Sequence, residues 1–267
     1  KSFIPLSGWP ISFGDLKQYY KQAAKMLGIS YKKFYSKDYF QDTFEGMRFK
    51  NFNRPNSLLS GNVFQVSNAV DRDFGNKYKI DFESTINTDV IFHSTVTELN
   101  LSNTRKGIHS VSVSDLNGNK AIIKAKIFVL ACGALENPRI LLTSNKYHKN
   151  GIGNDTGFVG SCFMSHPGVA NVSEIYKPSP EECTDEDKYN NDYIVQFEMS
   201  TQERKKSKVL RHILSVSEGQ GLVNSLTCVL SNRSSSKINL NVALEQPPRL
   251  SNNITLHESK DGLGVSK

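Results

Sequence analysis

The chain has 267 residues, of which 37% are hydrophobic and 22% are charged, a composition typical of a globular protein. No run approaches the roughly 20 consecutive apolar residues of a membrane span, which argues against an integral membrane segment. The 33 basic and 26 acidic side chains give a net charge of +7, but the excess is scattered. Its densest cluster, Arg204–Lys208, is explained by a solvated loop, so we do not predict nucleic-acid binding.

Four cysteines are present, and their wide spacing fits neither a zinc site nor a redox CxxC pair. They suit unpaired thiols in a reducing compartment. The first residues also lack the pattern of a secretion signal, so we expect a cytoplasmic location.

The first predicted element is an amphipathic helix that starts near Ser12 and ends at Gly28. Asp15 stands three residues after Ser12, which is the spacing of a capping box. Apolar side chains then recur at helical spacing, which predicts one packed face: Leu16, Tyr19, Tyr20, Ala23 and Leu27. Residues 31–79 show no sustained period and are predicted to be irregular.

The next segments have the pattern of strands. Residues 89–96 are rich in β-formers, and Asn117-Gly118 separates two alternating runs, which predicts a hairpin. Residues 127–132 (Ile-Phe-Val-Leu-Ala-Cys) are apolar on both faces, as in a strand buried in a parallel sheet. Gly133 would end this strand, and Asn137 would cap a helix with Pro138 at its first position. Strand, glycine turn and helix in succession indicate part of a doubly wound nucleotide-binding sheet.

The chain after Gly151 is dominated by alternating runs, which predict an antiparallel sheet. These runs cover residues 193–199, 210–216, 222–230 and 238–244, with a short one at 254–256. Residues 177–191, rich in Pro, Glu, Asp and Asn, are predicted to be a surface excursion. On the 238–244 strand and just beyond it, Asn239, Asn241 and Glu245 form a polar face, either a solvent face or the wall of a substrate cavity.

The remaining chemical motifs are weak. Gly151–Gly157 resembles a phosphate loop, but no strand precedes it, so its context is wrong for that role. Cys162 and His166 are four residues apart and would approach each other on a helix. Neither a third metal ligand nor an orienting partner lies near them, so no metal site and no catalytic pair is predicted.

Five segments, in order, resemble the glucose–methanol–choline (GMC) oxidoreductases, a family of FAD-dependent enzymes. The most characteristic is 125–142, AKIFVLACGALENPRILL. The others are residues 8–20 (GWPISFGDL with YY), 92–99 (FHSTVTEL), 151–167 (GIGNDTGFVG with FMSHP) and 244–264 (LEQPP, NITL and DGLG). Ser165 stands where the family's DHP motif has Asp, so His166 is interpreted as structural.

The resemblance implies FAD as cofactor and an interleaved domain order. Residues 1–80 would bridge two domains, 81–155 would form part of the FAD-binding domain, and 156–267 would form the antiparallel substrate domain. Val96 matches a position whose backbone meets the adenine of FAD. Ala131, Cys132 and Gly133 match the turn beside the ADP ribose.

The resemblance also implies an activity, namely oxidation of the CH–OH group of an alcohol or sugar by hydride transfer to flavin. The family's glycine-rich FAD motif and its catalytic histidine segment find no match, so we expect a central portion of a longer enzyme, partnered by the rest of its own chain. We therefore assign no catalytic residue, and we expect the portion alone to be inactive. The alternatives are a cofactor-free, degenerate module of the same fold, or a flavoenzyme closer to cholesterol or pyranose oxidases.

Overall fold

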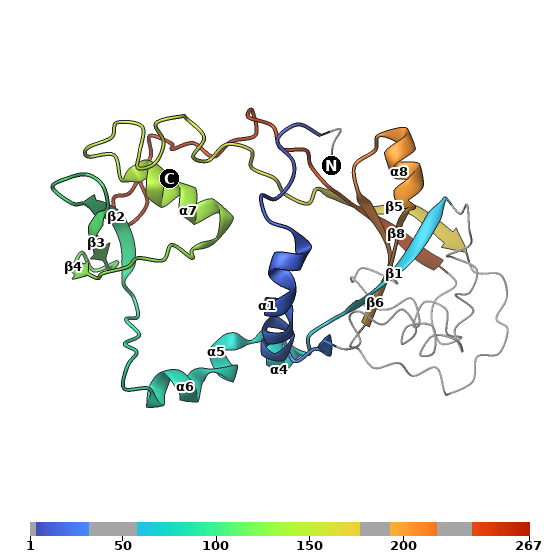
Figure 1. The fold of residues 1–267 in the computed structure, drawn as a ribbon, viewed down its shortest axis with the longest axis horizontal. Coiled ribbons are helices and arrows are strands. Elements are labelled where there is room, and N and C mark those ends of the chain that lie inside the picture. The colour runs from blue at the N-terminus through green and yellow to red at the C-terminus, as the bar shows by residue number, and fades with distance from the viewer. Residues whose placement is uncertain (1–3, 32–57, 177–192, 218–236) are drawn as a thin grey trace. The chain divides into compact units, whose positions relative to one another are not determined.

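The computed structural model describes residues 4–31, 58–176, 193–217 and 237–267 (Figure 1). These residues form two compact units, each made of segments that are distant in sequence. The first unit contains residues 8–84 and 165–246, and the second contains 85–164 and 247–267. Within the described ranges, no helix is long and apolar enough to cross a membrane.

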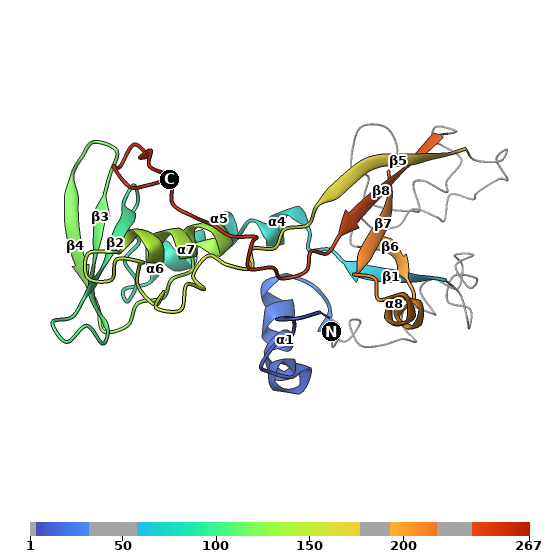
Figure 2. The same cartoon turned by 90° about the horizontal axis from the view of Figure 1, so that it is seen from above.

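The first unit is built on a five-stranded antiparallel sheet with strand order β1-β6-β7-β8-β5 (Figure 2). Its strands are β1 (Leu59–Gln65), β5 (Gly168–Tyr176), β6 (Tyr193–Met199), β7 (His212–Ser217) and β8 (Lys237–Leu244). The antiparallel sheet predicted from alternation is confirmed for β6, β7 and β8. The expected run at 222–230 and the excursion at 177–191 lie outside the described residues.

Helix α1 (Phe13–Met26) begins as the sequence predicts. The Ser12 Oγ accepts the Asp15 N–H at 3.3 Å, and the Ser12 N–H donates to the Asp15 carboxylate at 2.7 Å, which completes the capping box. The predicted packed face is only partly right, because Tyr19 is 57% exposed and the buried residue is Ala24. Helical spacing identifies a stripe but not the surface that covers it.

The interval 31–79 contains regular structure that the sequence did not predict. Besides β1 it holds the short helices α4 (Ala69–Arg72) and α5 (Phe74–Lys77), and α6 (Lys79–Ser84) follows them. Strand β1 contains Gly61 and Asn62, which are poor strand formers, beside Val63 and Phe64, so its own strand propensity is mixed. It forms because its backbone pairs with β6 over the full length from Leu59 to Gln65. Helix α8 (Thr201–Ser207) also belongs to this unit.

The second unit contains a three-stranded antiparallel sheet and one helix. The strands, in order, are β2 (Thr95–Leu101), β3 (Ile108–Ser114) and β4 (Lys120–Lys124), and the helix is α7 (Gly133–Thr143). The hairpin predicted at Asn117-Gly118 is confirmed: Gly118 has φ +86° and joins β3 to β4. Val111, Val113 and Ile140 are buried in this unit.

Helix α7 lies beside β2 (Figure 1). The buried Ser144 Oγ accepts the Leu99 N–H at 2.8 Å and donates to the Ile140 carbonyl at 2.7 Å. One hydroxyl group therefore satisfies the Leu99 N–H on the unpaired edge of β2 and the Ile140 carbonyl in the last turn of α7.

The strand predicted at 127–132 is wrong. Residues 125–131 carry no strand, and the side chains of Ile127 and Val129 are 80% and 83% exposed. A buried parallel strand needs neighbouring strands on both sides, and every strand pairing among the described residues is antiparallel. The doubly wound sheet therefore stays a prediction.

Two other strand predictions are also wrong, the first in its extent and the second altogether. Residues 89–94 carry no strand, since β2 begins at Thr95. Residues 254–256 form no strand either, because Ile254 donates its N–H to the Gly160 carbonyl of a loop instead of joining a ladder.

The unit boundaries do not coincide with the segments 1–80, 81–155 and 156–267 that the sequence suggested. Residues 156–164 and 247–267 lie in the unit of the three-stranded sheet and not in that of the five-stranded sheet. The reason is that Asn252 and Ile254 make backbone hydrogen bonds with residues 160–163, and Ser266 accepts a hydrogen bond from Arg139 of α7. The functional roles assigned to those segments stay predictions.

Candidate cofactor site

The predicted cofactor residues Ala131, Cys132 and Gly133 lie together at the start of α7, and all three are exposed. Gly133 is the first helical residue and has φ +87°, a conformation that favours glycine. A Cβ added there would meet nothing within 4 Å. The space beside this turn is therefore open, and the backbone can be approached closely.

The side chain of the N-cap residue, Cys132, makes no capping hydrogen bond to the first turn of α7. The first N–H groups of a helix have no partner within the helix, and they carry the positive end of its dipole. This arrangement suits oxygen atoms of an anionic or hydroxylated ligand.

Asn137 has a different position from the one the sequence predicts. It lies inside α7, which begins four residues earlier, at Gly133. Its Oδ1 accepts the backbone N–H of Cys132 at 2.8 Å. The expected capping role is therefore wrong: the side chain reaches back to the turn before the helix, and Pro138, which follows it, has no N–H to offer.

Arg139 fastens the same helix to the segment 257–267. Its Nε donates to the Ser266 carbonyl at 2.8 Å, and its guanidinium pairs with Asp261 at 2.5 Å and Glu136 at 2.9 Å. Burial alone would lower the pKa of Arg139, but the hydrogen bonds to Asp261 and Glu136 raise it above its ordinary value. The N–H of Val265, together with Arg139 and the N–H of Leu263, lowers the pKa of Asp261.

Val96, the fourth predicted cofactor residue, lies on β2 opposite Val113 and is half-buried. A bulge follows it, because the pairing with β3 shifts between Val96 and Glu98. Helix α7 and β2 pack together at Leu99 and Ser144, the far end of the helix from Gly133. The structure thus places Val96 and Gly133 in one unit, and the described contacts do not join them directly.

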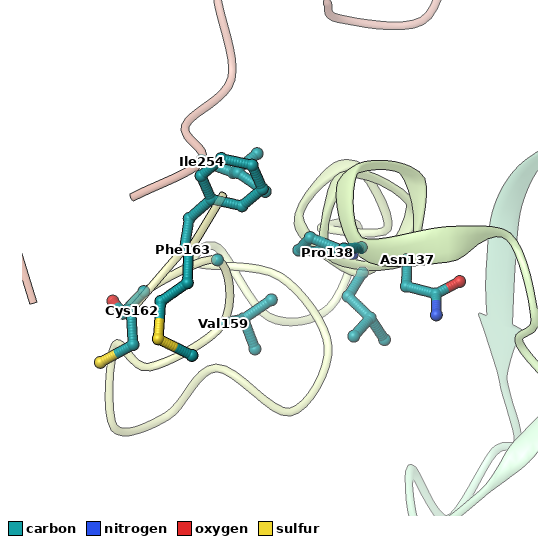
Figure 3. A pocket seen from close by; sticks show the side chains of 11 residues that line it. Asn137, Pro138, Val159, Cys162, Phe163 and Ile254 are labelled. Carbon is teal, nitrogen blue, oxygen red and sulfur yellow. The ribbon is translucent and has the colours of Figure 1, made fainter. Parts of the chain in front are cut away.

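A groove of about 450 Å³ lies beside α7 (Figure 3). Its lining is largely apolar and combines the helix with residues 159–164 and Ile254. A second hollow of about 260 Å³ is more polar and is lined by residues such as Asn145, Lys149 and Asn253. The backbone holds these walls together: Ile254 N–H donates to Gly160 O at 2.9 Å, and Phe163 N–H donates to Asn252 O at 2.8 Å.

Two side chains of the predicted polar face of the five-stranded sheet accept hydrogen bonds from backbone N–H groups. Asn241 Oδ1 accepts the Asn171 N–H at 3.0 Å, within the β5 segment where pairing with β8 shifts. Glu245 accepts the Arg211 N–H at 3.0 Å. Asn239 pairs through its backbone with Ser217 and Glu174. Neither hollow described above is lined by these residues, so a substrate wall here stays a prediction.

Cys162 and His166 do not lie on a helix, so the spacing that would bring them together is not realised. Cys162 belongs to the second unit, with φ +59°, and the exposed His166 belongs to the first. In the residues that the structure describes, no three His, Cys, Asp or Glu side chains gather as a metal site would require.

The comparisons with known proteins decide the family. A family model described as GMC oxidoreductase matches residues 8–168, more than half of the chain. The chain belongs to the GMC oxidoreductase family. The resemblance drawn from the ordered motifs is thereby confirmed. No curated protein matches this chain.

The matched region of a GMC oxidoreductase is its FAD-binding domain, so the protein is an FAD-dependent oxidoreductase. The start of α7 fits this cofactor by its donor chemistry. It offers uncapped backbone N–H groups and an open glycine to the phosphate and ribose oxygen atoms of a dinucleotide. The sequence predicted the glycine turn before this helix of the GMC oxidoreductase. It did not predict the long-range partners of Arg139, because Asp261 lies 122 residues away.

Proposed function

We propose that this protein oxidises the CH–OH group of an alcohol or sugar, with residues 131–133 and Val96 contributing to the FAD site. Hydride transfer from the substrate carbon to flavin is the chemistry that FAD supplies when bound. The observation that carries the proposal is the open, uncapped start of α7 inside the region that matches the family.

Each residue of the site has a separate task in this proposal. The N–H groups of the first turn of α7 bind cofactor oxygens, and Gly133 allows the ligand to approach the backbone. Val96 contributes at the edge of β2. The unit of 85–164 and 247–267 would belong to the FAD-binding domain, and the five-stranded unit would belong to the substrate domain. We assign no catalytic base among the residues of this chain.

The first experiment measures reduction of bound flavin. Full-length protein is reconstituted with FAD and mixed without oxygen with a panel of alcohols and sugars, and the absorbance of oxidised flavin is followed. Loss of that absorbance with one substrate class supports the proposal. A yellow protein that no panel member bleaches contradicts the substrate class alone. A colourless protein contradicts the cofactor site and favours the cofactor-free alternative.

A pair of glycine variants tests the site directly. Gly133→Ala and Gly153→Ala each place a side chain at positive φ, and neither added Cβ meets an atom within 4 Å. Their intrinsic backbone strain is therefore similar. We expect Gly133→Ala to weaken FAD binding about tenfold and Gly153→Ala to leave it unchanged, measured by flavin fluorescence titration. Equal effects of the two variants would contradict a cofactor contact at Gly133.

A further inference from the structure

We infer that Asn137 is a positioning residue for the cofactor, because it sets the conformation of the turn that precedes α7. The inference rests on the proposed FAD site. The side-chain Oδ1 of Asn137 accepts the backbone N–H of Cys132 at 2.8 Å, across five residues. This single hydrogen bond joins the body of the helix to the turn that leads into the N–H groups proposed to bind the cofactor.

The turn needs such a support because its own backbone is unusual. Cys132 has φ −93° and ψ 9°, and Gly133 follows at φ +87°. Glycine has wide conformational freedom, so nothing in its own chemistry selects this conformation. The amide of Asn137 supplies the selection, because the Cys132 N–H can reach Oδ1 only when the turn is folded back on the helix.

The sequence around Asn137 leaves the first turn of α7 weakly held by its own backbone. Pro138 lacks the N–H that would bond to the Ala134 carbonyl, so one helical hydrogen bond is missing there. Asparagine also has low helix propensity, because its side chain competes for backbone groups. In α7 the Asn137 side chain bonds to a backbone group in this way, but that group is the N–H of Cys132, which lies outside the helix.

The direction of the side chain agrees with this role. Asn137 contributes to the lining of the 450 Å³ groove, yet in Figure 3 its amide group points away from Val159 and Cys162. The groove therefore does not explain why this residue has a polar amide group. The hydrogen bond to the Cys132 N–H explains it.

The test compares variants that remove the acceptor with one that keeps it. Asn137→Leu removes Oδ1 at similar size, and Asn137→Asp retains an acceptor oxygen. In full-length protein we expect N137L to speed hydrogen exchange of the Cys132 amide and to weaken FAD binding about tenfold. N137D should restore slow exchange and, in enough salt to screen its added charge, FAD affinity. Should N137L not fold, Asn137→Ala replaces it.

A control on the same helix separates positioning from stability. Arg139→Met breaks the contacts to Asp261 and Ser266 and leaves the Cys132 turn intact. It should lower the melting temperature with little effect on FAD affinity. Wild-type affinity in N137L despite fast Cys132 exchange overturns the inference, as does failure of N137D to rescue. If the unaltered protein binds no FAD, the proposed function fails, and the inference fails with it.

Discussion

At the scale of single residues, Arg139 makes the side-chain contacts that hold the segment 257–267 against α7. It is 19% exposed and pairs with Asp261, which is 25% exposed, so the two charges are partly shielded from water. Asp261 also accepts the N–H groups of Leu263 and Val265 at 2.9 Å each. One carboxylate therefore folds its own loop and holds that loop against α7.

The lowered pKa of Asp261 predicts a dependence of stability on pH. A carboxyl whose pKa falls on folding stabilises the protein above its unfolded pKa, about 3.9, and loses this contribution as the pH falls through its lower folded pKa. Asp261→Asn should therefore cost about 1 kcal/mol at neutral pH. The difference in unfolding free energy between this variant and the wild type should disappear in strong acid.

Urea unfolding at a series of pH values measures this effect. Glu258→Gln is the control, because Glu258 makes no ion pair within the described residues and lies only three positions away. The prediction would be contradicted if the difference in unfolding free energy between wild type and Asp261→Asn stayed constant from neutral pH down to about pH 2.

At the scale of elements, close backbone approach joins the loop 157–163 to the segment 252–256. Gly160 has φ +84°, and a Cβ added there would lie 2.5 Å from the Ile254 carbonyl oxygen. The same two residues share the hydrogen bond from Ile254 N–H to Gly160 O. Glycine is therefore required by both conformation and space, and this contact forms one wall of the groove beside α7.

Gly160→Ala should destabilise the protein by about 3 kcal/mol, because the strain of positive φ adds to a clash with backbone that cannot move aside. Gly153→Ala is the matched variant, with φ +69° and nothing within 4 Å of the added Cβ. It should cost only about 1 kcal/mol. Denaturant unfolding of both variants measures the difference, and equal costs would show that the approach to Ile254 is not tight in solution.

At the scale of the whole molecule, the chain passes repeatedly between its two units. Residues 247–267 complete the unit that 85–164 begins, although the chain between them, 165–246, belongs to the five-stranded unit. The closing segment supplies Asn252 and Ile254 to the loop at 160–163, and Ser266 and Asp261 to Arg139. The stability of the unit that contains α7 is therefore coupled to residues 247–267.

A chain that ends at residue 246 tests this coupling through two cysteines. Cys132 is exposed and Cys162 is partly covered in the same unit. Without 247–267, the loop at 160–163 loses its partners and opens locally, so alkylation of Cys162 should speed up about tenfold. Cys132 should react at an unchanged rate. Mass spectrometry of the two peptides measures both, and an unchanged Cys162 rate would contradict the coupling.

Local signals account for the elements that sequence reasoning predicted correctly. The capping box at Ser12 and Asp15, the Asn117-Gly118 turn and the alternation of β6 to β8 each depend on residues a few positions apart. The ordered motifs that identified the GMC family are likewise a property of the linear chain. Short-range hydrogen bonds and side-chain periodicity carry this information without reference to the rest of the fold.

The tertiary structure alone decided which partners distant segments find. Residues 127–132 have the composition of a buried strand, yet a strand forms only where another backbone pairs with it. Strand β1 has mixed strand propensity, and it forms where β6 pairs with it. The Asn137 bond to Cys132 and the Arg139 bond to Asp261 depend on side-chain direction and on contacts across up to 122 residues. Composition and spacing do not encode these, so the local geometry of the candidate site came only from the folded chain.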